Sequence, residues 1–95
     1  MDGDHHTKVN NLCDAFLLLK SRQEVFNFLK DLCTPQEITA MAERLWVCQL
    51  LNKGDLSYRD IHRITGASLT TIGRVSRFLK EEPHKGYETI LKRMP

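Results

Sequence analysis

Two polar clusters flank Gly66, and both carry side chains that could bind a polyanion. Guanidinium and imidazole groups precede the glycine, and a run of hydroxyl and basic side chains follows it. Such groups suit noncovalent contacts to phosphate oxygens and to base edges. The candidate residues are Arg59, His62, Arg63, Ser68, Leu69, Thr70, Thr71, Gly73, Arg74 and Arg77.

Two short helices joined by a turn are expected to carry these residues. Ser57 and Asp60 have the spacing of a capping box, which predicts a helix from about residue 58 to about 65. Gly66 makes the turn, and Ser68 is suited to cap a second helix whose apolar residues recur at helical spacing. The sequence therefore predicts a helix-turn-helix over about 57–80, a motif that places its second helix in the major groove of double-stranded DNA.

The motif divides the candidate residues by role. Ser68, Thr70, Thr71, Gly73 and Arg74 stand at the front of the second helix, where contacts to bases or to a phosphate are expected. The basic side chains of the first helix and of the later turns are expected to hold the sugar-phosphate backbone; these are Arg59, His62, Arg63, Arg77 and Lys80. Because the front of the helix lacks asparagine and glutamine, direct base reading should be sparse, with room for recognition of DNA shape.

The rest of the chain is predicted to be helical. Residues 1–10 show no periodicity and are expected to form a flexible arm ahead of a single domain over 11–95. Apolar residues from Leu12 mark a first helix, a capping box at Ser21 and Glu24 starts a second, and Thr34 with Pro35 starts a long third helix that ends at Gly54. A last short helix follows Pro83. The predicted fold class is all-α, with about six helices.

Composition and charge exclude several classes of protein. The 95 residues carry a net charge of +2, but residues 1–43 hold a net −3 and residues 44–95 a net +5, so the basic field surrounds the predicted motif. No stretch is apolar enough to span a membrane and no export leader is apparent, so we expect a cytoplasmic protein. Cys13, Cys33 and Cys48 lack the spacing of a disulfide framework or zinc site and are expected in a reduced core.

Catalysis is not expected, because the histidines and cysteines are scattered and no phosphate-binding glycine loop follows a strand. No metal and no cofactor is predicted. The alternative to DNA binding is a helical protein-interaction module, in which the helix-turn-helix is only a packing unit. Salt dependence would separate the two, since binding to a polyanion weakens steeply as salt rises.

One run of sequence resembles a known family. Residues 34–80, TPQEITAMAERLWVCQLLNKGDLSYRDIHRITGASLTTIGRVSRFLK, are similar without gaps to the tryptophan-repressor superfamily and, within it, to the Trp repressor-like YerC/YecD family. The resemblance implies an intertwined homodimer that acts as a DNA-binding transcriptional regulator, most simply as a repressor. The apolar character of the first two helices also favours self-association. Residues expected at the subunit seam are Phe16, Phe26, Phe28, Trp46 and Leu51.

The resemblance further implies a ligand pocket. In the tryptophan-responsive member, the indole lies between two arginines and near a capping threonine, and the matching residues here are Arg44, Arg74 and Thr34. Val75 and Phe78 stand where that repressor has small residues. We therefore expect these two side chains to fill the cavity, so that tryptophan does not bind; whether another effector binds is left open.

Overall fold

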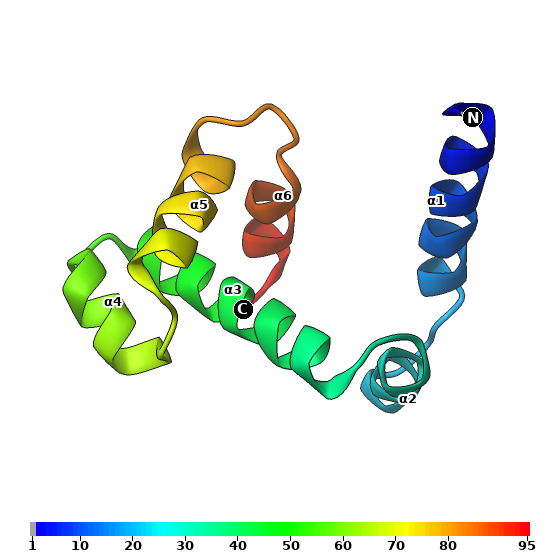
Figure 1. The fold of residues 1–95 in the computed structure, drawn as a ribbon, viewed down its shortest axis with the longest axis horizontal. Coiled ribbons are helices and arrows are strands. Elements are labelled where there is room, and N and C mark those ends of the chain that lie inside the picture. Colours follow the sequence, from blue (N-terminus) through cyan, green and yellow to red (C-terminus); the bar gives the residue numbers. More distant parts are fainter. Residues whose placement is uncertain (1) are drawn as a thin grey trace. The chain divides into compact units, whose positions relative to one another are not determined.

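The computed structural model describes residues 2–95, and these contain six helices and no strand. Figure 1 shows the helices in chain order: α1 (Asp2–Leu17), α2 (Arg22–Leu32), α3 (Pro35–Lys53), α4 (Tyr58–Thr65), α5 (Leu69–Lys80) and α6 (Gly86–Arg93). The predicted all-α class is confirmed. The chain divides into two compact units, Met1–Ile38 and Thr39–Pro95, with the boundary inside α3.

The first unit contains α1 and α2, joined by residues 18–21. Phe16 of α1 and Phe28 of α2 meet edge to face, with ring centroids 5.2 Å apart. No side chain of residues 4–38 is buried, and Leu17 and Leu18 are 82% and 75% exposed. This unit therefore has aromatic contacts between its helices but no core of its own.

The start of α1 differs from the prediction of a flexible arm over residues 1–10. Residue 1 lies outside the described residues, but α1 already begins at Asp2. The prediction depends on apolar residues at helical spacing, and the first turns of α1 carry almost no apolar residues. Their backbone hydrogen bonds instead extend the helix that contains Leu12, and the carboxylate of Asp4 suits the positive end of its dipole.

Side-chain caps fix where α2 and α3 begin. The Ser21 hydroxyl accepts from the Glu24 amide at 3.1 Å, while the Glu24 carboxylate accepts from the Lys20 amide at 2.8 Å, one residue earlier than a capping box requires. The capping box of α3 is reciprocal: Thr34 Oγ1 accepts from the Glu37 amide, and Glu37 Oε1 accepts from the Thr34 amide. These two bonds hold the pKa of Glu37 below its ordinary value.

The second unit contains the only buried residues among those described. Its core joins α3, α4, α5 and the turn between the last two, through Val47, Cys48, Leu51, Ile61, Ala67, Ile72 and Val75. Tyr87 and Leu91 of α6 pack against it. Leu51 is only 8% exposed, so it is a core residue rather than the expected seam residue, whereas Phe26 and Trp46 remain about half exposed.

The cysteines follow the prediction only at Cys48. That side chain lies in the core, where burial raises the pKa of its thiol to about 11. Cys33 is half-buried and Cys13 is exposed on α1, so the expectation of three buried cysteines is wrong for Cys13. Cys13 lies on a helix of the unit that has no core of its own.

Candidate nucleic-acid interface and adjoining pocket

The predicted helix-turn-helix is present as α4, a turn and α5. Ser57 Oγ accepts from the Asp60 amide at 3.1 Å, and Asp60 Oδ2 accepts from the Ser57 amide at 3.2 Å, so the predicted capping box forms. Gly66 ends α4 in the left-handed conformation, with φ of 80°. A side chain there would be strained, which explains why glycine makes this turn.

The front of α5 is capped as predicted. The Ser68 hydroxyl accepts a hydrogen bond from the Thr71 amide at 3.0 Å, and its oxygen lies 3.0 Å from the Thr71 hydroxyl. Ile72 and Val75 face the core, which leaves Leu69, Thr70 and Arg74 exposed. Thr71 and Gly73 are half-buried. The exposed side chains thus share the outer side of a helix whose inner side is fixed.

The basic side chains differ in how they are paired. Arg63 Nη2 lies 3.1 Å from Asp60 Oδ1, and Arg77 Nε lies 3.4 Å from Glu82 Oε1. Together with the Ser57 cap, the Arg63 contact keeps the pKa of Asp60 low. Among the side chains of residues 4–95, neither Arg59 nor Arg74 forms an ion pair, although both are exposed. Arg59 and Arg74 are therefore the arginines of this motif whose charge is not offset by a nearby acid.

His62 is oriented differently from what its position in the sequence predicts. Its Nδ1 lies 2.6 Å from the carbonyl oxygen of Ala67, across the turn. The residue as a whole is exposed, but this edge of the ring is partly covered. One ring nitrogen of His62 is thus engaged within the protein rather than directed to a phosphate.

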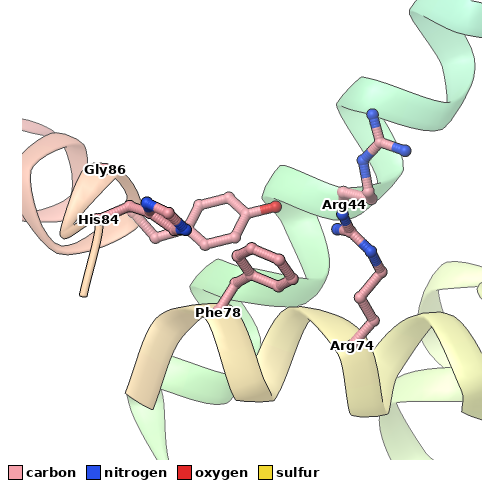
Figure 2. Close-up of a pocket in the computed structure, with 6 residues that line it drawn as sticks. Arg44, Arg74, Phe78, His84 and Gly86 are labelled. Atoms are coloured by element: carbon pink, nitrogen blue, oxygen red, sulfur yellow. The ribbon is translucent and has the colours of Figure 1, made fainter. Parts of the chain in front are cut away.

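A pocket of about 420 Å³ lies beside α5, the second or recognition helix of the motif (Figure 2). It is lined by Arg44 of α3, by Arg74 and Phe78 of α5, by His84 of the connection that follows α5, and by Gly86 and Tyr87 at the start of α6. The Arg74 guanidinium lies 4.3 Å from the centroid of the Phe78 ring, and the His84 ring stacks on Phe78 with centroids 5.9 Å apart. Phe78 therefore gives Arg74 an aromatic surface from within the chain.

The pocket corrects part of the sequence prediction. Val75 is fully buried in the core and does not line the pocket, and Phe78 lines it without filling it. The Thr34 hydroxyl caps α3, and its expected place near the pocket stays a prediction. His84, Gly86 and Tyr87 were not predicted as pocket residues, since only the fold of α6 brings them to Arg44 and Arg74.

Among the side chains that the structure describes, no three His, Cys, Asp or Glu residues gather where a metal ion could bind. No helix among the described residues has the length and apolar character needed to cross a membrane.

Fold and site together define a class, the all-α proteins that present a capped helix-turn-helix on a small helical core. The profile of the Trp repressor protein family matches residues 7–95, so the chain belongs to the Trp repressor family. This is a family of transcription regulators rather than of enzymes, which makes the chain a DNA-binding regulator.

Individual relatives agree with this assignment. The chain is 39% identical over 87 residues to the uncharacterized protein YerC of Bacillus subtilis (strain 168), covering 92% of this chain and 82% of that protein. It is 41% identical over 54 residues to a Trp operon repressor homolog of Aliivibrio salmonicida (strain LFI1238), covering 57% of this chain and 50% of that one.

Solved structures match over nearly the whole length. A TrpR-like protein from Eubacterium eligens ATCC 27750 gives a TM-score of 0.86 at 37% identity, covering 92% of this chain and 88% of that chain. A candidate Trp repressor from Staphylococcus aureus gives 0.85 at 39% identity, covering 93% and 86%. These likenesses confirm the family resemblance seen in residues 34–80.

Proposed function

We propose that the protein is a sequence-specific repressor that binds double-stranded DNA as a homodimer in the cytoplasm. The observation that carries this proposal is the exposed outer side of α5, where Thr70 and Arg74 stand beside a Ser68-capped helix end with unpaired positive charge. Arg59 on α4 adds a second unpaired cation. A helix N-terminus, hydroxyl groups and free guanidinium groups are the donors that phosphates and base edges accept.

The exposed apolar side chains of the first unit support the homodimer. No side chain of residues 4–38 is buried, and the large apolar residues left exposed there include Leu12, Leu17, Leu18, Phe26 and Leu32. A second copy would cover these residues, and residues 11–95 of each chain would then form one DNA-binding and dimerisation domain. Sedimentation equilibrium should give twice the monomer mass, and Leu18→Asp should shift the protein toward monomer; a monomer in the unmodified protein would contradict the proposal.

DNA binding is tested by selecting bound fragments from a pool of random duplexes. A homodimer should recover two related half-sites roughly one turn of the duplex apart, a spacing taken from helix-turn-helix dimers in general. The logarithm of the binding constant should fall linearly with the logarithm of salt concentration. If no sequence is enriched, or if binding is insensitive to salt, the alternative of a protein-interaction module is favoured.

Tryptophan is not expected to control this protein. The Phe78 ring already lies against the Arg74 guanidinium at 4.3 Å, on the surface where an aromatic ligand would stack. Isothermal titration with tryptophan should therefore give no heat of binding. Thermal denaturation with and without tryptophan should give the same melting temperature. A saturable response would overturn this part of the proposal, and a response to a different small molecule would identify an effector for the pocket.

We expect repression rather than activation, because a bound dimer would cover the promoter. A dimer bound over a promoter excludes polymerase, so deletion of the gene should raise expression from promoters that carry the selected site. Lower expression from those promoters after deletion would show an activator instead.

A further inference from the structure

We propose that His62 is a positioning residue for DNA reading, which holds the turn ahead of α5 through its bond to Ala67 instead of contacting phosphate. The inference rests on the proposed function. It assigns to His62 a role different from the backbone contact that its place on α4 predicts.

The bond fixes the protonation pattern of the ring. His62 Nδ1 lies 2.6 Å from the Ala67 carbonyl oxygen, and a carbonyl can only accept a hydrogen bond. Nδ1 therefore carries the proton. In the neutral ring, the other nitrogen, Nε2, is then left as an acceptor, which has no proton to donate to a phosphate oxygen. The neutral side chain is thus suited to the turn and poorly suited to the DNA backbone.

The Ala67 carbonyl depends on this donor. Ala67 is fully buried, so no water reaches its carbonyl while the His62 ring is in place. The amide of Thr71, which would normally pair with this carbonyl in a continuing helix, is bonded to the Ser68 hydroxyl at 3.0 Å. Among the described residues, His62 is the one that donates a hydrogen bond to the Ala67 carbonyl.

The remaining polar groups of the turn have partners of their own. The Gly66 amide donates to the His62 carbonyl at 2.9 Å, and the Ala67 amide donates to Thr65 Oγ1 at 3.1 Å. Thr65 Oγ1 in turn donates to the Ile61 carbonyl at 2.7 Å. The His62 side chain completes this set, because it ties α4 to the residue directly before the Ser68 cap. The front of α5 is thereby held in place before DNA arrives.

Substitution by asparagine and by glutamine separates positioning from direct contact. An Asn amide places a donor near the position of Nδ1, whereas a Gln amide places it near that of Nε2. Affinity is measured for the duplex recovered by selection and for a random-sequence duplex of equal length. His62→Ala and His62→Gln should weaken binding to the selected duplex about tenfold, as expected for one buried carbonyl left unpaired, and random-sequence binding should change less. His62→Asn should stay within about twofold of the unmodified protein on the same basis.

A second measurement needs no DNA. Nitrogen NMR of the imidazole should show Nδ1 as the protonated nitrogen of His62. Amide exchange at Ala67 and Ser68 should be faster in the Ala and Gln variants and unchanged in the Asn variant, while circular dichroism confirms that each variant is folded. If the unmodified protein binds no DNA, the proposed function fails. The NMR and amide-exchange results would then still test whether His62 holds the turn.

The inference is overturned by three results: an Ala variant that binds the selected duplex as the unmodified protein does, a Gln variant that retains affinity when the Asn variant loses it, or a neutral ring protonated at Nε2. The Gln result would mean that the far edge of His62 contacts DNA directly.

Discussion

The Arg74 guanidinium lies 4.3 Å from the centroid of the Phe78 ring, one helical turn along α5. The Arg77 guanidinium lies 5.2 Å from the same centroid, and His84 stacks on the ring. One aromatic side chain therefore contacts both exposed arginines of the recognition helix, and it restricts the orientations that Arg74 takes up before binding.

Replacing the ring should loosen Arg74. Phe78→Leu removes an exposed cation–π contact worth about 0.5–1 kcal/mol, so DNA affinity should fall roughly twofold to fivefold. Phe78→Tyr keeps a ring and serves as the control. Fluorescence anisotropy with the selected duplex measures both variants, and equal affinity of the Leu variant and the unmodified protein would show that Phe78 does not organise Arg74 for binding.

Thr70 offers a more direct test of the recognition surface. It is exposed and makes no cap contact, so Thr70→Ala should reduce affinity about twofold to tenfold, as loss of one hydrogen bond does, without changing the melting temperature. Thr89→Ala, at an exposed position of α6, is the matched control. Combining Thr70→Ala with Thr71→Ala should abolish the footprint on the protein's own promoter; an unchanged footprint means that α5 does not read DNA through these hydroxyl groups.

Ile61 and Ile64 provide a matched pair for the core. Both lie on α4, but Ile61 is fully buried and Ile64 is 42% exposed. Ile61→Ala should lower the free energy of unfolding by about 2–5 kcal/mol because it leaves a cavity, and Ile64→Ala should cost far less. Urea denaturation measures both. Similar losses of unfolding free energy in the two variants would mean that the packing of α4 against α5 and α3 does not stabilise the fold.

The Asp60 cap should make stability depend on acid pH. Bonds from Ser57 keep the pKa of Asp60 below its ordinary value of 3.8. Protonation of Asp60 therefore favours the unfolded chain. The contribution of the ionised Asp60 carboxylate to folding stability is complete above about pH 4 and is lost as pH falls through the lowered pKa.

The measurement compares the unmodified protein with Asp60→Asn in urea at pH 7 and at pH 3. The variant should be less stable at pH 7, and the gap should narrow at pH 3. Asp55→Asn removes an exposed carboxylate that makes no cap and controls for net charge. A gap of constant size across this range would show that the charge of Asp60 does not stabilise α4.

Some features of the fold could be predicted because their causes are local. Ser57, Ser68 and Thr34 each bond an amide three residues along, and Gly66 adopts the left-handed turn without strain, so these helix starts and the turn follow from neighbouring residues. The exposed face of α5 follows in the same way from the spacing of Ile72 and Val75.

The features that the sequence did not predict depend on contacts between residues distant in sequence. The pattern of residues is enough to predict a capped helix-turn-helix with basic side chains around it. The packing of the helices, in contrast, brings His62 to the buried Ala67 carbonyl, places Val75 in the core and adds His84, from outside the motif, to the pocket beside Arg44. The reason is physical: a cap is decided within one turn of chain, whereas the direction of a side chain is decided by the packing of helices distant in sequence.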